Sequence, residues 1–258
     1  MFDIVHSHTM KHALAQDRHD ALERLLAEQG SVAVSRIAKR LNVSAMTVRR
    51  DLDKLAARGG VSRVHGGAVA QDKLRFGTRL ERGSKAKAAA ARKLLPLIPE
   101  RGAVYFDGST TIFQLVSLLA GRSGLTVATN NLDTFLALTR QPGIEPVLVG
   151  GTLNRATDNF VGPFTRRCLD GMAFSAALFS AFALDPDVGP GEPASEDAEL
   201  KSFVCGRCQR VGLAVDAAKL GQHAAGIWQL PGQATLATDL RPSDRRLDPF
   251  RSRFATIL

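Results

Sequence analysis

The sequence predicts an α/β protein in which a small, mostly helical N-terminal domain precedes a larger domain built on a mostly parallel sheet. Three observations support this prediction. Helical patterns follow one another closely in residues 18–57, short apolar strands alternate with helices after residue 100, and the excess of basic residues is confined to the first third of the chain. A chain of 258 residues, 45% of them hydrophobic, is long enough to bury a core in each domain.

The charge is distributed unevenly along the chain. Residues 1–95 hold 19 of the 34 Lys and Arg residues and 9 of the 25 Asp and Glu residues, so their net charge is +10, whereas residues 96–258 carry −1. This asymmetry is typical of a protein that meets a polyanion at one end, although a solvated basic surface gives the same count. The pattern within the first third decides between the two interpretations.

The remaining bulk features predict a cytoplasmic protein without a membrane span or a cofactor. No run of about 18 apolar residues is present, and the N-terminus lacks the apolar core of a signal peptide. The three cysteines, Cys168, Cys205 and Cys208, suit a reducing compartment better than a disulfide framework. Cys205 and Cys208 have the CxxC spacing, but a zinc site needs two more ligands, so we predict no metal or redox role for them.

The first helical pattern, residues 18–29, is amphipathic and ends at a glycine. Residues 31–34 are short and extended, and Ser35 is a suitable cap for a second helix. Residues 41–43 then form a short turn in which Asn42 tolerates the left-handed backbone that a tight connection between helices needs.

The third helical pattern begins at Ser44, a suitable N-cap, and places Val48, Leu52 and Leu55 on an inward face. Two short helices joined by a three-residue turn, the second rich in Thr and Arg, are typical of a helix-turn-helix whose second helix enters the major groove. An ordinary three-helix bundle with a charged surface is the alternative interpretation.

Residues 61–70 follow as two short extended runs around a Gly-Gly pair, which predicts a hairpin wing. Together with the turn length and the arginine pair, this basic wing favours DNA binding over the plain bundle. The residues predicted to contact bases or phosphates are Ser44, Thr47, Arg49, Arg50, Lys54, Arg63 and His65.

The run VAVSRIAKRLNVSAMTVRRDLDKLAARGGVSRVHGGA, residues 32–68, resembles the N-terminal motif of the DeoR family of bacterial transcription regulators, in which VSxxTVRRDL and RxHGGA occur together. The resemblance implies a winged helix-turn-helix over residues 16–71, with its recognition helix at residues 44–57. The histidines and the lysine among small side chains in residues 1–15 separately predict a flexible tail.

Residues 72–85 are polar, basic and broken by two glycines, so we predict a linker, followed by an α/β domain over residues 86–240 and a flexible basic tail over residues 241–258. The alternation of strands and helices in this domain predicts helices on both faces of the sheet and ligands at the carboxyl ends of the strands. We expect strands at residues 103–106, 125–129, 146–149, 173–179, 211–215, 226–230 and 234–237, and helices at residues 84–95, 111–120, 132–139, 164–169 and 197–209.

Polar residues and glycines follow three consecutive strands of this predicted sheet. DGSTT opens a helix after the first strand, where hydroxyls and backbone N–H groups form a seat for phosphate. TNN follows the second strand and GG the third. Each segment alone is also explained as a turn or a cap, but their repetition at one edge favours a ligand site. The predicted effector-binding residues are Asp107, Gly108, Ser109, Thr110, Thr111, Thr129, Asn130, Asn131, Gly150, Gly151 and Lys219.

This half of the chain is also similar to the sensor domain of the DeoR family, through FDGSTT, TNN, VGG, NFVGP and VDAAKLG. The resemblance implies a fold related to sugar-phosphate isomerases and a phosphorylated sugar as effector, with the DGSTT loop holding the phosphate and Lys219 adding a cation. At Ser180, Ala181 and Phe182 the chain departs from the Gly-containing turn that the family often has.

Two further groups are interpreted as structural. The single Tyr and the single Trp, Tyr105 and Trp228, are predicted to lie in the core. The acidic residues Glu192, Glu196, Asp197 and Glu199 are predicted to form a solvated surface.

We therefore predict a DNA-binding regulator rather than an enzyme. It represses a sugar-catabolic operon, binds double-stranded operator DNA as a homo-oligomer, dimer or tetramer, and is released by a phosphorylated sugar. One alternative is an isomerase-like enzyme with a DNA-binding head, in which Asp107, Asp216 and Lys219 supply the base and its electrophilic partner. Another is an oligomerisation domain without a ligand, which predicts no thermal shift with any phosphorylated metabolite.

Overall fold

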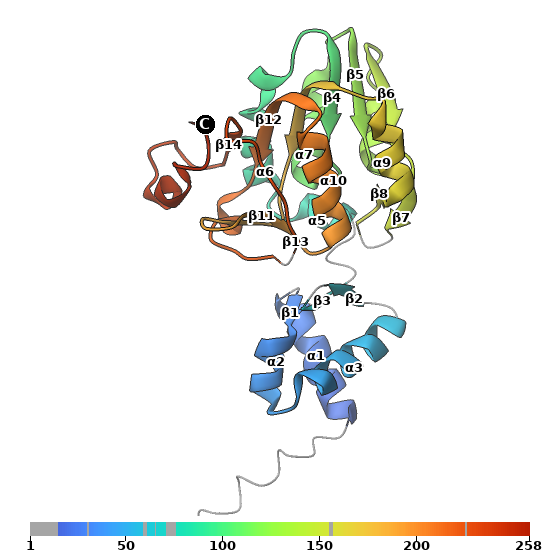
Figure 1. The fold of residues 1–258 in the computed structure, drawn as a ribbon, viewed down its shortest axis with the longest axis vertical. Helices are drawn as coiled ribbons and strands as arrows, with labels where there is room; N and C mark the ends of the chain where they lie inside the picture. The colour runs from blue at the N-terminus through green and yellow to red at the C-terminus, as the bar shows by residue number, and fades with distance from the viewer. Residues whose placement is uncertain are drawn as a thin grey trace, which may run out of the picture. The chain divides into compact units, whose positions relative to one another are not determined.

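The computed structural model describes residues 15–29, 31–58, 61–64, 66–70, 76–154, 157–224 and 226–258. The chain divides into two compact units, Met1–Arg75 and Phe76–Leu258 (Figure 1). The predicted flexible tail lies outside the described residues, except for its last residue, which begins a helix. Within the described ranges, no helix is both long and apolar enough to cross a membrane.

The smaller unit contains three helices and a three-stranded antiparallel sheet. The helices are α1 (Ala15–Gln29), α2 (Val34–Leu41) and α3 (Ala45–Ala57), and the sheet has the order β1-β3-β2, with β1 (Ser31–Ala33), β2 (Val61–Val64) and β3 (Gly67–Ala70). The inward faces predicted for the first and third helices are confirmed, because Leu22 and Leu52 are fully buried in one core. The two runs predicted as a wing pair as β2 and β3, and β1 adds a third strand.

The turn between α2 and α3 has the predicted geometry. Asn42 adopts the left-handed conformation, with φ 52° and ψ 46°. Ser44 Oγ accepts a hydrogen bond from the backbone N–H three residues further on, at 3.1 Å. The cap predicted at Ser35 is wrong, because α2 begins at Val34 and its N-cap residue, Ala33, makes no side-chain cap. Since Ala33 still pairs with β3, the helix starts directly where the strand ends.

A buried ion cluster joins α1 to α3. Asp51 of α3 is 3% exposed. Arg18 Nε lies 2.8 Å from Asp51 Oδ2, and His19 Nε2 lies 3.2 Å from Asp51 Oδ1. Burial opposes ionisation of this carboxyl, but the hydrogen bonds and charges of Arg18 and His19 outweigh burial and hold the pKa of Asp51 below its ordinary value. The cluster therefore fixes the orientation of α3 against α1.

Replacing Asp51 with Asn should lower the free energy of unfolding of the smaller unit by about 2–3 kcal/mol, somewhat less than for a fully buried pair because Arg18 keeps partial solvent contact. Because the folded-state pKa is depressed, the carboxylate stabilises the fold above its unfolded pKa of about 4, and this contribution is lost as pH falls through the folded-state pKa. Hydrogen exchange of α1 and α3 across a urea series, at pH 7 and at pH 2.5, measures the effect. A deficit of the variant that is equally large at both pH values would contradict the assignment.

The larger unit is built on a seven-stranded sheet in which every pairing is parallel. Its order is β15-β14-β12-β9-β4-β5-β6. The strands are β4 (Gly102–Phe106), β5 (Leu125–Thr129), β6 (Ile144–Leu148), β9 (Phe174–Phe179), β12 (Cys208–Ala214), β14 (Thr235–Ala237) and β15 (Thr256–Ile257). The predicted fold class, a winged helix-turn-helix followed by an α/β domain, is confirmed.

Helices cover both faces of this sheet. They are α5 (Phe76–Glu81), α6 (Ser84–Arg92), α7 (Thr110–Phe113), α8 (Leu132–Leu138), α9 (Pro163–Asp170) and α10 (Ser195–Cys205), with short 3-10 turns η1 (Leu95–Leu97), η2 (Val116–Leu119), η3 (Ala217–Lys219) and η4 (Arg245–Phe250). Side chains alternate along β4: Val104 and Phe106 join one core with residues of α6 and α7, whereas Tyr105 joins a second core with residues of α9 and α10. Figure 1 shows α10 lying in front of the sheet. Trp228 lies in the second core, as predicted.

Two small antiparallel sheets accompany the main one. Strands β7 (Thr152–Asn154) and β8 (Asn159–Val161) form a hairpin. Strands β10 (Ala183–Asp185), β11 (Gly189–Glu192) and β13 (Gly226–Ile227) form a three-stranded sheet with β11 in the centre.

Several boundary predictions are wrong. The helix expected at residues 111–120 is α7 followed by the 3-10 turn η2, and the strand expected at residues 226–230 is only the two-residue β13. Part of the predicted linker, residues 76–81, is helix α5, and Phe76 packs edge-on against Phe113 with ring centroids 5.1 Å apart. The helix expected to reach residue 209 ends at Cys205, because β12 begins three residues later and pairs with β9. Residues 241–258 are not a flexible tail: Leu247 and Phe250 are buried in the core, and β15 extends the sheet.

Candidate functional site

One face of α3 is exposed and carries the paired arginines. Met46 is 63% exposed, and Arg49 and Arg50 are exposed on the side of the helix away from buried Val48. Neither arginine forms an ion pair with another residue in the described part of the chain. Lys54, one turn further on, is exposed as well. Free guanidinium groups on an exposed helix can reach phosphates or guanine edges in a major groove.

Three other residues predicted to contact DNA, Ser44, Thr47 and Arg63, have partners within the smaller unit. The hydroxyls of Ser44 and Thr47 lie 2.9 Å apart and belong to the start of α3. Arg63 of β2 lies 2.8 Å from Asp53 of α3 and also donates to a backbone carbonyl of β3. The Arg63 guanidinium therefore ties the wing to α3 instead of standing free at the wing tip. His65 lies outside the described residues.

In the larger unit, two loops meet where the strand order reverses. β4 and β9 are neighbours, yet the chain runs from β4 outward through β5 and β6 before it returns at β9. Asp107 follows β4 and Ser180 follows β9, and both are 1% exposed. The Ser180 N–H donates to Asp107 Oδ2 at 2.9 Å. Ligands of open α/β sheets bind at such a reversal, outside the carboxyl ends of the strands.

The DGSTT loop forms the start of α7 at this point. Ser109 caps the helix, because its Oγ accepts from the N–H three residues further on at 3.1 Å. Thr110 and Thr111 are buried, and Thr111 Oγ1 lies 3.3 Å from Ser180 Oγ. The loops after β4 and β9 thus bring three hydroxyls, from Thr110, Thr111 and Ser180, to one region.

Two lysines reach these hydroxyls. Lys219 Nζ donates to Ser180 Oγ at 3.2 Å and to the Ala181 carbonyl at 2.7 Å, and its side chain remains 22% exposed. Lys87 of α6 donates to Thr110 Oγ1 at 3.1 Å. Desolvation lowers the pKa of Lys219, and desolvation together with the charge of Lys219 lowers the pKa of Lys87 to about 8. Two crowded, poorly hydrated ammonium groups beside hydroxyl donors favour an anion as ligand.

A third lysine, Lys201 of α10, lies between the two loops and was not predicted. Its Nζ lies 3.1 Å from Asp107 Oδ2 and 2.5 Å from Glu192 Oε1, and it donates to the Ser180 carbonyl at 2.7 Å. Burial opposes its charge, but Glu192 and Asp107 outweigh burial and raise the pKa of Lys201. Since its charge is neutralised within the protein, Lys201 holds the loops together.

The acidic segment predicted as a solvated surface divides into buried and exposed residues. Glu192 is 8% and Asp197 6% exposed, whereas Glu196 and Glu199 are exposed. Burial raises the pKa of both Glu192 and Asp197. The burial of Asp197 could have been predicted, because Asp197 and Lys201 stand four residues apart in the sequence and so share one face of the helix.

The TNN segment holds β8 in place. Thr129 Oγ1 accepts from the Asn131 N–H at 3.2 Å, and Asn130 Oδ1 accepts from the hydroxyl of the single tyrosine at 2.9 Å. Asn131 Nδ2 donates to Asn159 Oδ1 at 3.0 Å, and Asn159 Nδ2 donates to Asp197 Oδ1 at 3.3 Å. TNN is thereby connected to the carboxylate of Asp197 through Asn159, which was not predicted as a site residue.

Two of the predicted site glycines are required by close packing within the protein. A Cβ at Gly108 would lie 1.9 Å from Asn159 Oδ1, and a Cβ at Gly151, where φ is 154°, would lie 1.9 Å from Thr165 Oγ1. Gly150 has open space around it. No side-chain hydrogen bond or ion pair of the described residues joins Gly150 or Gly151 to the cluster around Asp107, so their contact with a ligand stays a prediction.

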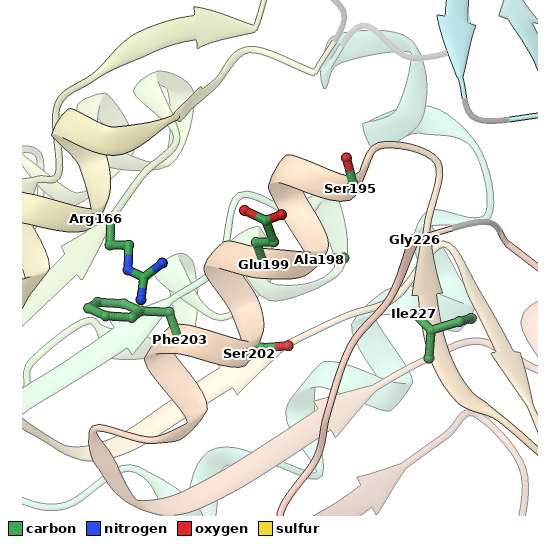
Figure 2. Close-up of a pocket in the computed structure, with 8 residues that line it drawn as sticks. All are labelled: Arg166, Ser195, Ala198, Glu199, Ser202, Phe203, Gly226 and Ile227. Carbon is green, nitrogen blue, oxygen red and sulfur yellow. The ribbon is translucent and has the colours of Figure 1, made fainter.

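A separate hollow lies on the outer side of α10 (Figure 2). Its volume is about 580 Å³, and it is lined by Arg166, Ser195, Ala198, Glu199, Ser202, Phe203, Gly226 and Ile227. Figure 2 shows the Arg166 guanidinium over the Phe203 ring, 4.7 Å from its centroid. The hollow is not lined by any of the predicted effector residues, and the helical period places Asp197 and Lys201 on the opposite face of α10.

The two cysteines with CxxC spacing stand at the end of α10 and the start of β12. Cys208 Sγ donates to the Cys205 carbonyl at 3.3 Å. Burial raises the pKa of both thiols, to about 11 at Cys208, so they are protonated at neutral pH.

Comparison with known proteins adds a second line of evidence. The chain matches the model of the DeoR-like helix-turn-helix domain over residues 18–73 and that of the DeoR C terminal sensor domain over residues 82–231. It is 31% identical to the lactose phosphotransferase system repressor of Lactococcus lactis subsp. lactis, over 91% of this chain and 94% of that protein. It is 28% identical to the L-fucose operon activator of Haemophilus influenzae, over 78% and 82%. Among solved structures, ribose 5 phosphate isomerase A from Neisseria gonorrhoeae aligns over 52% of each chain, with 16% identity and a TM-score of 0.37.

Proposed function

Since the chain belongs to the DeoR family of transcription regulators, we propose that it binds operator DNA through α3 and releases it when a phosphorylated sugar binds at the carboxyl ends of β4 and β9. The observation that carries the proposal is the arginine pair of α3, exposed and without ion-pair partners in the described part of the chain, on a helix whose other face is buried. The regulated genes are those of a sugar-catabolic operon.

The direction of control is repression. The relative with the higher identity of the two described above is named a repressor, and we propose the same direction here. Release then requires that the effector bind the DNA-free form more tightly than the DNA-bound form. A ligand with equal affinity for both forms would not change the fraction of protein bound to DNA.

The side chains at the carboxyl ends of β4 and β9 support an anionic effector. Lys87 and Lys219 have depressed pKa values and stand beside the hydroxyls of Thr110, Thr111 and Ser180. A phosphate group supplies the negative charge that two close ammonium groups need and accepts the hydroxyl hydrogen bonds. The sugar portion then lies toward Asp197 and Asn159, whose polar atoms suit hydroxyl groups.

The isomerase alternative receives no support from Asp107. Its Oδ1 accepts from the N–H and the hydroxyl of Ser109, and its Oδ2 accepts from the Ser180 N–H and faces Lys201. A general base needs a lone pair aimed at the substrate proton, whereas this carboxylate is surrounded by donors of the protein itself. The arrangement therefore favours sensing over catalysis.

We propose that the protein acts as a dimer or tetramer. A single recognition helix as short as α3 contacts only a few base pairs, which is too little for selective binding in a genome. Two DNA-binding domains on two half-sites read twice as many base pairs and so select one operator more strictly. The operator should therefore be an inverted repeat.

A thermal-shift screen against phosphorylated sugars and polyols tests the proposal. A ligand at 100 times its Kd should add about 2.7 kcal/mol to the free energy of unfolding and raise the melting temperature. The same sugar without its phosphate is the matched control and should give no shift. A positive compound should then release the protein from its operator. Absence of a shift with every phosphorylated compound would favour the oligomerisation interpretation, and turnover of any of them would favour the enzyme.

A further inference from the structure

Two neighbouring helices of the larger unit, α9 and α10, carry opposite charges on their exposed sides. Arg166 and Arg167 are exposed on α9, and Glu196 and Glu199 are exposed on α10. The two helices contact each other, yet none of these four side chains forms an ion pair within the described part of the chain. Exposed charges are often only solvated, so the apolar residues of the same face decide what it does.

This face contains the hollow shown in Figure 2 and carries exposed apolar side chains. The lining of the hollow includes Ala198, Phe203 and Ile227, and Ile227 is 40% exposed. Phe164 of α9 is 69% exposed, more than any other large hydrophobic side chain in the described part of the chain. It stands two residues before Arg166, which also lines the hollow. An exposed aromatic ring close to an open, partly apolar hollow is typical of a protein interaction surface.

A second copy of the chain fits both the charges and the hollow. In a two-fold contact the same face meets itself, so α9 of each copy lies against α10 of the other. The arginines of α9 then meet the glutamates of the partner's α10, and this pairing occurs twice. Phe164 of each copy faces the hollow beside the partner's α10. An aromatic side chain in a pocket with a polar rim is the usual composition of a stable interface.

We propose that two copies of the chain associate through α9 and α10, with Phe164 of each copy in the hollow of the other and Arg167 paired with Glu199 across the two-fold axis. The inference rests on the proposed function, because selective operator binding needs two DNA-binding domains, and it assigns the surface that holds them together. Asp197 and Lys201 lie on the opposite face of α10, so this surface is distinct from the effector site.

Sedimentation velocity of the full-length protein over a concentration series tests the apolar part of this surface. Phe164→Asp should raise the dissociation constant of the assembly by a factor of about 30 or more, as expected for loss of an aromatic side chain buried at an interface. A wild-type dimer should then become monomeric, and a wild-type tetramer dimeric. Val188→Asp is the matched control, because Val188 is 53% exposed between β10 and β11 and does not line the hollow. This control should assemble like the wild type.

Charge reversal tests how the two copies are arranged. Arg167→Glu and Glu199→Lys each place like charges against each other twice across the axis, so each variant alone should associate about tenfold or more weakly. In an equimolar mixture, the two variants should associate about as tightly as the wild type, because every reversed side chain then meets an opposite charge. Both side chains are exposed, so the variants should keep the wild-type fold.

The outcomes separate the inference from the proposed function. If Phe164→Asp assembles like the wild type, or if the mixture associates no more tightly than each charge variant alone, another surface joins the copies and the inference is wrong. That result leaves the assignments of α3 and of the effector site standing. If the wild type is a monomer at concentrations that saturate the operator, both the inference and the proposed oligomer are wrong. The mixture decides the inference even where Phe164→Asp fails to fold.

Discussion

Replacing Arg49 and Arg50 together with Ala should weaken operator binding by a factor of about 100 or more while leaving the fold intact. Each arginine contact to a base edge or phosphate contributes about 1–3 kcal/mol, and both side chains are exposed, so their loss removes little packing. The salt dependence should flatten too, by about 0.9 in the slope of log affinity against log salt for each lost phosphate contact. Fluorescence anisotropy of an operator duplex at several salt concentrations measures both effects.

The matched control removes two exposed arginines from the larger unit, Arg101 and Arg140, and so changes the net charge equally. Its operator affinity should stay close to that of the wild type. If the α3 variant and this control lose the same amount of operator affinity, the loss is caused by the change in net charge, and α3 is not the recognition helix.

Replacing Thr110 with Glu should abolish the response to phosphorylated sugars, with a loss of at least 100-fold in effector affinity, while operator binding stays unchanged. Thr110 is 3% exposed and its hydroxyl accepts from Lys87. A carboxylate at this position pairs with the Lys87 ammonium and repels an incoming phosphate, at an energy cost of several kcal/mol in a poorly hydrated site. Calorimetric titration with the best compound from the thermal-shift screen measures the loss.

Two further variants test whether the effect of Thr110→Glu comes from the effector site or from the added charge alone. Ser117→Glu adds the same charge at an exposed position of η2 and should respond normally. Lys219→Met removes a cation without adding bulk, and it should weaken effector binding about tenfold or more. A Thr110→Glu protein that still leaves its operator in the presence of the sugar phosphate would show that the phosphate binds elsewhere.

The structure of the smaller unit could be predicted from the sequence, because the features that determine it are local. The cap at Ser44 and the left-handed turn at Asn42 act within a few residues of the chain, and the spacing of Val48 and Leu52 marks the buried face directly. What the sequence pattern missed there is the partner of Arg63, since the approach of β2 to Asp53 depends on how the wing folds back.

Only part of the candidate effector site could be predicted from the sequence, because its residues are brought together by the strand order. The loop after β4 and Lys219 follow strands and were predicted from that position. Lys201 and Glu192 lie on α10 and β11, and nothing in their local sequence states that these elements lie near the carboxyl ends of β4 and β9. Charged residues in polar stretches are usually solvated, so such residues are recognised only when the strand order is known.

The C-terminal residues show the same limit. Residues 241–258 are rich in arginine and lack a clear apolar period, which is typical of a tail. Yet Leu247, Phe250 and Phe254 are buried in the same core as Tyr105 and Trp228, and β15 pairs with β14. Two apolar side chains on a 3-10 turn and a third four residues beyond it produce no recognisable periodicity, although all three are buried.

Photo-crosslinking from α3 tests the central claim most directly. A photoreactive amino acid replaces Met46, which is 63% exposed, and in a second protein it replaces Glu23, which is exposed on α1. Each protein is irradiated with a duplex selected from random sequences by the wild type. The account predicts that only the protein with the photoreactive residue at position 46 crosslinks to bases of the selected site. This crosslink should disappear when the stabilising sugar phosphate is added. Crosslinks of equal yield from both positions, or none from position 46, would contradict it.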